Sequence, residues 1–438
     1  MKQWPMLIVL WLAALTAAHA EVTGGELDAA AAALQSRVID WRRDFHMHPE
    51  LGNREFRTSG IVEKHLRSLG LEVRTGIAHT GVVALLRGAL PGPTIMFRAD
   101  MDALPVTERT DVPFRSTALT EYRGRQVGVM HACGHDAHTA MLMGAAKVLA
   151  GLRERLPGTV MFVFQPAEEG VPEGEQGGAP MMIQEGLFDI AKPDAIFGLH
   201  VFSTLHTGEL GVRSGPFMAG SDFFRVLVTG RQSHGARPWA GIDPIVTAAQ
   251  IVTSLQTIVS RQTDITALPV VVSVGAINGG VRHNIIPDSV EILGTIRTFS
   301  PASRQETIDR MQRIVANVAE ANGATAALEM MPAPNPVLAN DPALTQKVIA
   351  SLSGAFGADA VKAIGLQTIA EDYSYYTRQA PSVYYLVGIT SPEQDLRTAP
   401  DNHSDQFYLD ETGMAVGLRS ILHVAVDYLQ GAAPAPGS

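Results

Sequence analysis

Two patterns of hydrophobic and polar positions alternate along most of the chain. Short apolar runs occupy residues 94–97, 159–164 and 195–199, and the segment 137–156 carries apolar residues at helical spacing. Apolar runs that alternate with helical segments are typical of strands joined by crossover helices. We therefore predict an α/β fold for the larger part of the chain.

The pattern changes between residues 218 and 332. In this region the sequence predicts a strand at 222–230, a helix opened by Asp243 and Pro244, strands at 269–277 and 289–299, a helix opened by Ser300 and Pro301, and a strand at 324–331. The order β-α-β-β-α-β is the ferredoxin-like one. Ile245, Ala249, Val252 and Val259 share one side of the first helix, and we expect that side to face the core.

This change of pattern divides the chain into two domains. Residues 218–332 are predicted to form a domain inserted into a larger one, which comprises residues 21–217 and 333–430. The last eight residues, 431–438, read "GAAPAPGS" and are predicted to form a disordered tail.

The first twenty residues have the pattern of a secretory signal peptide. Lys2 precedes an apolar run, and Ala18, His19 and Ala20 match a cleavage site with small residues at its first and third positions. The run is shorter than the ~20 apolar residues of a spanning helix. We therefore expect cleavage after Ala20, no membrane attachment of the mature chain, and a secreted or periplasmic protein.

Composition limits the kinds of partner that the chain can bind. The 438 residues carry a formal net charge of −10 and contain one cysteine. Clustered Lys and Arg residues supply most of the affinity of nucleic-acid-binding proteins, and the sequence has no such cluster, so we expect no nucleic-acid partner. Cys133, as the one cysteine, cannot form an internal disulfide.

Polar residues follow the apolar runs of the larger domain. Asp100 and Asp102 follow the first run, Glu168 and Glu169 follow the second, and His200 ends the third. Ligands of open α/β sheets bind at the carboxyl ends of the strands. We therefore expect these side chains to border one site.

The segment "CGHDAHT" at 133–139 fits the same edge of the sheet. Asp136 is expected to cap the helix that follows, and Cys133 and His135 lie just before it, two residues apart, so that both side chains can face one ion. Three interpretations are open at this point, namely a nucleophile with its base, two metal ligands, or a buried thiol and ring. Thiolate, imidazole and carboxylate together suit Zn, Mn, Fe, Co or Ni better than Ca or Mg.

Two other classes of protein compete with a metal-dependent enzyme. A cysteine hydrolase would use Cys133 as its nucleophile, but it would leave the adjacent Glu168 and Glu169 without a task. A secreted solute-binding protein would explain export and an inserted domain, but not this pair of carboxylates.

An ordered series of motifs resembles one family over nearly the whole mature chain. The motifs are "DMDALP", "HACGHDAH", "QPAEEG", "GLHV", "SHGARP", "HNIIPD", "GTIRTF" and "NHSDQF". They resemble the metallo-aminoacylases and carboxypeptidases of the hippurate-hydrolase and indoleacetyl-amino-acid-hydrolase type. The resemblance implies a metallopeptidase-like catalytic domain with a mixed sheet and an inserted lid, and metal-dependent hydrolysis of the amide bond of an N-acyl amino acid or short peptide.

The resemblance also implies two divalent metal ions, Zn, Mn or Ni. The residues at ligand positions are Cys133, His135, Glu169, His200 and His403. Cys133 is then the expected bridge between the ions, and Glu168 stands at the position of the general base. Asp102 is expected to orient a metal ligand by a hydrogen bond without binding the metal itself. Many relatives carry a His-x-Asp pair where this chain has Asp100, Met101 and Asp102, so Asp100 receives no role.

Three residues of the inserted domain match functional positions of the family. His234 is expected to reach the active site of a partner subunit and stabilise the oxyanion, and Asn284 and Arg297 are expected to hold the substrate carboxylate. The resemblance therefore implies a homodimer formed through the lid. We expect the acyl pocket to be formed by the lid and the loop "EDYSYY" at 371–376, and the stretch 171–180 to be an insertion that alters access.

Overall fold

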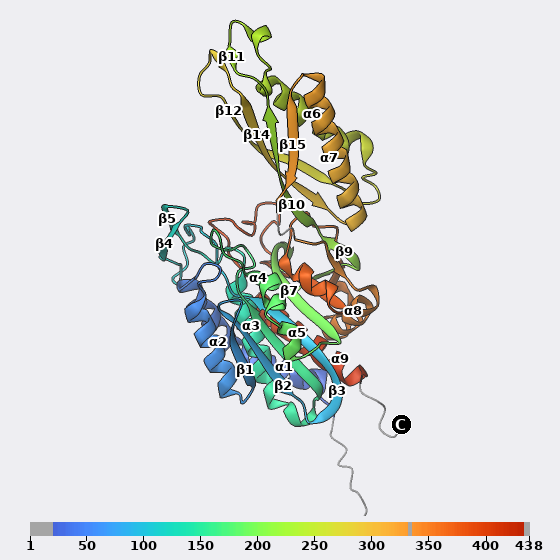
Figure 1. Cartoon of the computed structure of the whole chain (residues 1–438). Coiled ribbons are helices and arrows are strands. Elements are labelled where there is room, and N and C mark those ends of the chain that lie inside the picture. Colours follow the sequence, from blue (N-terminus) through green and yellow to red (C-terminus); the bar gives the residue numbers. More distant parts are fainter. Residues whose placement is uncertain (1–20, 332–334, 433–438) are drawn as a thin grey trace, which may run out of the picture.

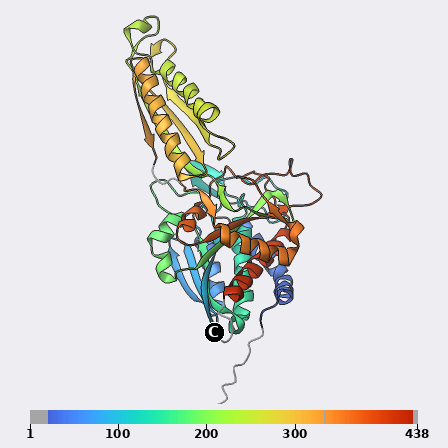
Figure 2. The ribbon, with the colours of Figure 1, turned by 90° about the vertical axis from the view of Figure 1, so that its right-hand side faces the viewer.

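The computed structural model describes residues 21–331 and 335–432. They form a larger α/β unit and a smaller unit that stands away from it (Figures 1 and 2). The candidate signal peptide, 1–20, and residues 433–438 of the predicted tail lie outside the described residues. Among the described helices, none has both the length and the apolar character that a membrane crossing requires.

The larger unit is built on one eight-stranded mixed sheet. Its order is β1 (Glu72–Ile77), β2 (Gly81–Arg87), β6 (Pro157–Gln165), β3 (Leu90–Asp100), β7 (Ala195–His206), β18 (Ser382–Thr390), β8 (Leu210–Val212) and β17 (Val361–Ala363). Strands β6, β3, β7 and β18 are parallel neighbours, whereas β1, β2 and β6 pair antiparallel. The predicted α/β class and mixed sheet are confirmed.

Helices cover both faces of this sheet. One face packs against α1 (Gly24–Met47), α2 (Phe56–Ser68), α3 (His135–Gly151), α8 (Pro342–Phe356) and α9 (Thr412–Ala432), and the other against the shorter α4 (Gly178–Gln184) and α5 (Leu187–Ile190). Alternate residues of β3 supply the two cores, because Ile95 and Phe97 point to the first and Met96 to the second. The central strands are therefore buried on both sides, which explains their continuous apolar runs.

The smaller unit has the predicted ferredoxin-like order. It comprises β10 (Gly220–Thr229), α6 (Pro244–Gln262), β12 (Val271–Gly279), β14 (Ser289–Thr298), α7 (Pro301–Ala321) and β15 (Thr325–Met330), with an antiparallel sheet in the order β12-β14-β10-β15. Both helices begin as the sequence predicts. The Asp243 side chain accepts from the N–H of Ile245, and the Ser300 side chain accepts from the N–H of Ser303. We call this unit the lid.

The buried side of α6 overlaps only in part with the expected one. Of the four predicted residues, Val252 and Val259 are partly buried and pack against the lid core, whereas Ile245 and Ala249 are exposed. The fully buried residues include Ala248, Ile251, Leu255 and Ile258. Apolar residues cover much of the circumference of this helix, so two sides satisfy helical spacing, and packing against the lid sheet selects one of them.

Two short antiparallel pairs mark the ends of the lid. At its base, β9 (Gly215–Met218) pairs with β16 (Leu338–Asn340), so the two segments that enter and leave the lid run side by side. At its far tip, where Figure 1 labels β11, β11 (Ser233–His234) pairs with β13 (Ile285–Ile286). A further hairpin, β4 (Leu119–Tyr122) with β5 (Arg125–Gly128), projects from the larger unit. At the C-terminus, α9 includes residues 431 and 432, so the predicted tail is helical at its start.

Candidate metal centre

The polar residues that follow the apolar runs meet at one edge of the sheet. Strand β3 lies between β6 and β7 and is parallel to both. It ends at Asp100, β6 ends three residues before Glu168, and β7 carries His200. Because parallel strands share a carboxyl edge, these side chains converge, as the sequence indicates.

Gly134 places Cys133 and His135 against β7. It precedes α3 with φ of 94°, a conformation that favours glycine, and a Cβ atom there would lie 2.3 Å from Val201 Cγ2. Only glycine therefore allows this turn to approach the strand closely.

The prediction that Asp136 caps α3 is wrong. Asp136 is the second residue of the helix, and no side chain caps the preceding Gly134. Its Oδ2 atom instead lies 2.8 Å from both Arg42 Nε and His46 Nδ1, inside the protein. A charge-assisted hydrogen bond to the buried Arg42 stabilises this carboxylate more than an exposed helix-capping bond would.

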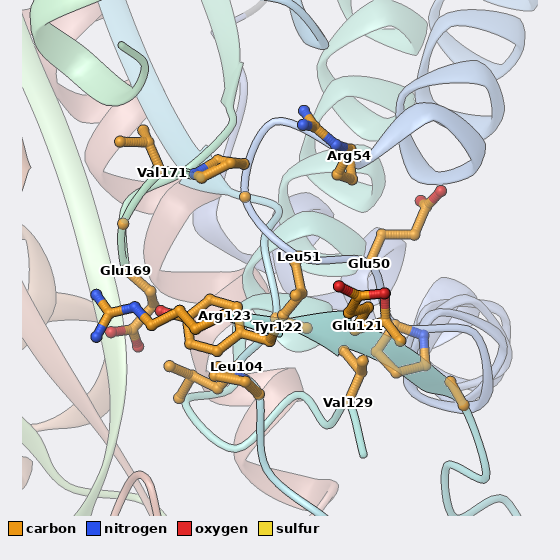
Figure 3. Close-up of a pocket in the computed structure, with 18 of the residues that line it drawn as sticks. Glu50, Leu51, Arg54, Leu104, Glu121, Tyr122, Arg123, Val129, Glu169 and Val171 are labelled. Atoms are coloured by element: carbon orange, nitrogen blue, oxygen red, sulfur yellow. The ribbon is translucent and has the colours of Figure 1, made fainter. Parts of the chain in front are cut away.

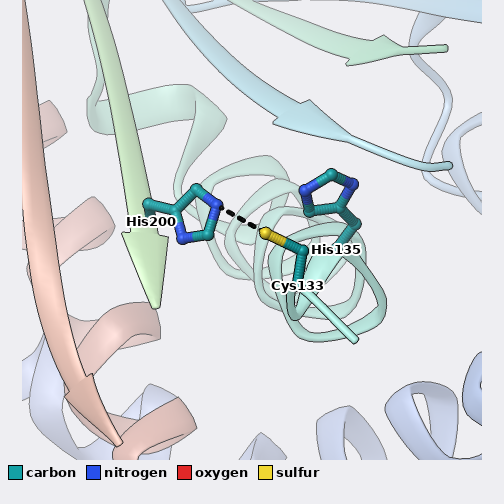
Figure 4. A group of neighbouring side chains, drawn as sticks. All are labelled: Cys133, His135 and His200. Carbon is teal, nitrogen blue, oxygen red and sulfur yellow. Dashed lines mark hydrogen bonds between the residues drawn. The ribbon is translucent and has the colours of Figure 1, made fainter. Parts of the chain in front are cut away.

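Cys133, His135 and His200 form the first cluster of possible ligands (Figure 4). The Cys133 Sγ and His200 Nε2 atoms are 3.3 Å apart. His200 Nδ1 donates to the Val201 carbonyl at 2.7 Å, and His135 Nδ1 donates to the Asp102 carbonyl at 2.9 Å. With each proton held at Nδ1, the Nε2 lone pairs are available to a metal ion.

Cys133, Glu169 and His403 form a second cluster, in which Glu169 Oε1 lies 2.9 Å from His403 Nε2. Cys133 belongs to both clusters. The structure thus brings together all five residues that were expected to bind metal, and the shared residue is the expected bridge. That they hold ions stays a prediction.

Asp102 supports one residue of each cluster. Its Oδ1 atom lies 3.2 Å from His135 Nδ1, and its Oδ2 atom accepts the backbone N–H of Glu169 at 2.9 Å. This geometry fits the expected role of Asp102 as an orienting residue.

The structure gives Asp100 a place and adds His138, which sequence reasoning missed. Asp100 Oδ1 accepts from His138 Nδ1 at 2.6 Å, and His138 Nε2 accepts the N–H of Val201 at 2.9 Å. These bonds tie α3 to β7 beside His200. The second histidine of "GHDAH" was the available signal, but only a fold could say what it contacts.

Arg98 is a second residue that sequence reasoning missed. It is buried among three carboxylates, with contacts of 2.5 Å to Asp100, 3.0 Å to Glu371 and 2.9 Å to Asp372. The backbone N–H of Asp372 donates to Glu168 Oε1 at 3.3 Å. Arg98 is therefore connected to the candidate base through the loop at 371–372.

The same contacts correct the expected acyl pocket. Arg98 draws the loop "EDYSYY" inward, and the rings of Tyr373 and Tyr376 are wholly buried in the core on one face of the sheet. These two rings cannot line a substrate pocket. They support the sheet beneath the site instead.

The electrostatics of the centre indicate a shortage of positive charge. Burial, followed by the charges of Glu371 and Glu169, raises the pKa of Glu168 well above its usual value. Burial and the two glutamates 168 and 169 likewise raise the pKa of the Cys133 thiol. Burial disfavours the charged form of His135, but Asp100 and Asp102 outweigh it and raise its pKa to about 10. A divalent cation among these groups would favour the ionised acids and the neutral ring.

Unpartnered buried atoms give independent support for a cation. His135 Nε2 is buried and has no hydrogen-bond partner among the described residues. Buried polar atoms normally have partners. Together with the soft thiolate and imidazole donors, this atom fits a transition-metal ion better than an empty, dry centre.

The three candidate residues of the lid are separated. His234 is exposed on β11 at the tip, and Asn284 lies beside it, where its carbonyl accepts the N–H of Gly235 at 2.9 Å. Arg297 lies at the opposite end of β14, where it pairs with Ser221 near the base of the lid. One chain therefore does not bring Asn284 and Arg297 together, and its own metal centre is remote from His234 (Figure 1).

The fold and the site together define a two-domain metallohydrolase of the aminoacylase and carboxypeptidase class. In agreement with this, the sequence profile of Peptidase family M20/M25/M40 matches residues 96–426. The chain belongs to this family, and the resemblance seen in its motifs is confirmed.

Relatives match over most of their length. Thermostable carboxypeptidase 1 of Saccharolobus solfataricus is 38% identical over 399 residues, which cover 90% of this chain and 96% of the relative. The N-acyl-L-amino acid amidohydrolase of Geobacillus stearothermophilus is 41% identical over 292 residues, 67% of this chain and 75% of the relative. The crystal structure of the Bacillus subtilis YXEP protein, a dinuclear metal binding peptidase from the M20 family, is 33% identical with a TM-score of 0.76 and covers 91% of this chain and 99% of that protein.

The geometry of Asp102 leads to a first prediction. Asp102→Ala removes the support of both His135 and Glu169, so metal affinity should fall roughly 10- to 100-fold, the usual effect of losing such a partner. Metal titration of chelated protein measures this. Asp359→Ala, which removes an exposed carboxylate from the short turn at Ala358–Ala360, is the control, and equal affinities in the two variants would contradict the role given to Asp102.

Proposed function

We propose that this protein hydrolyses the amide bond of an N-acyl amino acid or a short peptide in a metal-dependent reaction. The observation that carries this proposal is the pair of ligand clusters that share Cys133 and lie beside Glu168. Relatives named as an N-acyl-L-amino acid amidohydrolase and a carboxypeptidase support the same substrate class.

Two divalent ions, Zn, Mn or Ni, fit the residues present. Cys133, His135 and His200 would hold one ion, Cys133, Glu169 and His403 the other, with the thiolate between them. The similarity to a dinuclear metal binding peptidase supports this count. When bound, such ions lower the pKa of water and polarise an amide carbonyl.

Glu168 is positioned to handle the proton. The Asp372 N–H donates to one oxygen of its carboxylate, and the Glu168 carboxylate lies within 4.8 Å of the possible ligand atoms of His135 and Glu169. In the hydrolysis Glu168 takes a proton from the attacking water and delivers it to the nitrogen of the leaving amino acid. The adjacent Glu169 serves as a ligand, so the two carboxylates divide the work.

A cysteine hydrolase is not favoured. The contact between Cys133 and His200 has the length that a nucleophile and its base would need. However, burial and the neighbouring Glu169 raise the pKa of the thiol, whereas a nucleophilic cysteine needs a lowered one. If Cys133 is instead a metal ligand, the positive charge of the bound ion stabilises its thiolate form in the same environment.

The division of labour between the carboxylates can be tested. Glu168→Gln should reduce kcat by at least about a hundredfold and keep its metal, because the base is lost but the ligands remain. Glu169→Gln should lose metal as well. Elemental analysis and a rate assay on N-acyl amino acids distinguish the two variants, and near-normal turnover by Glu168→Gln would show that another group is the base.

We also propose that the protein works as a homodimer formed through the lid. His234 and Asn284 lie together at the tip, where they are out of reach of their own metal centre, and Arg297 lies at the base. A partner's tip would bring the three together. Large apolar side chains exposed on the lid, Trp239, Ile245, Val246, Ile277 and Val281, support contact with a second copy.

His234→Ala should lower kcat roughly a hundredfold or more with metal content unchanged, since an oxyanion donor acts on the transition state. His283→Ala, at an exposed position of the same tip, should be near normal. A purified heterodimer of Glu168→Gln and His234→Ala chains contains one complete site and should recover about half the wild-type rate per dimer. A verified heterodimer without recovery would exclude action across the dimer.

We further propose that residues 1–20 direct export and that the mature protein is secreted or periplasmic. The pattern of Lys2, the apolar run and the small residues Ala18 and Ala20 supports this. Mass spectrometry of the exported protein should find Glu21 as the first residue. Retention of Met1 on membrane-bound protein would replace the cleaved signal with an anchor.

A further inference from the structure

A large cleft in the larger unit reaches the candidate metal centre. Its volume is about 930 Å³, within the range of small-molecule sites, and Glu169 forms part of its wall. Its lining comes from four segments of the larger unit, residues 49–54, 103–105, 118–129 and 169–173, and none of the lining residues belongs to the lid. Figure 3 shows Glu169 at one side of the cleft, with Leu51 near the middle of the view and Val129 towards the other side.

Apolar side chains form a continuous part of the cleft lining, beside the charged residues that border it. Leu51, Leu104 and Val129 lie along it, and Tyr122 projects from the β4–β5 hairpin. Leu119 of the same hairpin is 64% exposed and Val171 is 39% exposed. Because water contact of such side chains is unfavourable, an apolar group that entered the cleft would be stabilised by covering them.

The charges of the cleft decide which end of a substrate it can accept. Four glutamates and two arginines line it: Glu50, Glu121, Glu169, Glu173, Arg54 and Arg123. Arg54 is already paired with Glu175, at 2.5 Å. Glu169 is a candidate metal ligand, so the ions would balance its charge. Away from the metal centre, the other three glutamates still outnumber the two arginines, and this excess disfavours a free carboxylate but not the neutral acyl end of an N-acyl amino acid.

The shape of the cleft is supported on the side of residues 169–173. The following residues are held by Arg54, which binds Glu175, and by Asn53, whose side-chain amide donates to the Gln176 carbonyl at 2.9 Å. A Cβ atom at Gly177 would lie 2.5 Å from Asn53 Oδ1, so this segment packs closely. The wall that carries Val171 is thus fixed before a ligand binds, which lowers the cost of binding.

We propose that this cleft is the subsite for the acyl group of the substrate, that it takes large apolar acyl groups, and that Leu119, Tyr122 and Val171 set the preferred acyl size. The assignment rests on the proposed function. The arrangement places the acyl arm along the catalytic unit and leaves the carboxylate of the amino acid to Arg297 of the lid. An acetyl group would leave most of the cleft unfilled.

The test compares Leu119→Asp and Val171→Asp with two control variants of matched exposure. Phe56→Asp changes a side chain that is 65% exposed, and Met47→Asp one that is 40% exposed, both outside the cleft. The metal-loaded enzymes are assayed with N-acetyl, N-hexanoyl and N-decanoyl derivatives of one amino acid. The ratio of kcat/KM for decanoyl over acetyl substrates should fall about tenfold or more in the cleft variants and stay unchanged in the controls.

Two further measurements distinguish a failure of the cleft assignment from a failure of the proposed function. In a second series the acyl group is fixed and the amino acid varied, and calorimetry follows the binding of decanoate to the metal-loaded enzymes. An unchanged acyl ratio in both cleft variants, or a change in amino-acid preference instead, overturns the assignment. If no N-acyl amino acid is hydrolysed by the wild type but Leu119→Asp weakens decanoate binding about tenfold, the proposed function fails while the cleft remains a site for apolar chains.

Discussion

The burial of the Arg98 guanidinium among three carboxylates is the interaction on which the catalytic edge depends. Through Asp100 it fixes His138, which holds the backbone of Val201 next to His200. Through Asp372 it holds the loop whose N–H binds Glu168. A buried charge network of this kind is costly to break, by about 3–5 kcal/mol when one partner is lost. One side chain thus controls the positions of a candidate ligand and the candidate base.

The centre built on this network contains more acidic groups than the arginine and histidine side chains around it can neutralise. The protein alone raises the pKa values of Glu168 and Cys133 and favours a protonated His135. Each of these tendencies opposes catalysis, and each is reversed by positive charge in the same place. The fold therefore concentrates negative charge at the point where the possible ligand atoms converge, and divalent ions bound there would neutralise it.

The sequence predicted the elements and the convergence of the site better than it predicted contacts. Apolar runs and polar endings located β3, β6 and β7, because strand ends in a parallel sheet obey a general rule. The sequence analysis expected Ile245 and Ala249 of α6 in the lid core, Asp136 as a helix cap and the loop at 371–376 as part of the acyl pocket. The structure differs at each of these points, because Ile245 and Ala249 are exposed, Asp136 lies inside α3 and Tyr373 and Tyr376 are buried. In each case two local choices were equally good, and a distant element decided between them: the lid sheet for α6, Arg42 for Asp136, and Arg98 for the loop at 371–376. Arg98 gave no signal, and the second histidine of "GHDAH" did not indicate its contacts, since the partners of both residues are assembled only by the fold.

The pairing of β9 with β16 places the hinge of the lid at its base. Both covalent connections pass through this pair, so a rotation of the lid about it displaces each residue in proportion to its distance from the base. Arg297 lies near the hinge and hardly moves, whereas the tip lies about 30 Å further along, the length of a ten-residue strand such as β14. A rotation of about 10° then shifts His234 by roughly 5 Å, more than the length of a hydrogen bond. A rotation of the lid would therefore hardly displace Arg297, which is expected to bind the substrate carboxylate, and would displace His234, which is expected to meet the reacting atoms, the most.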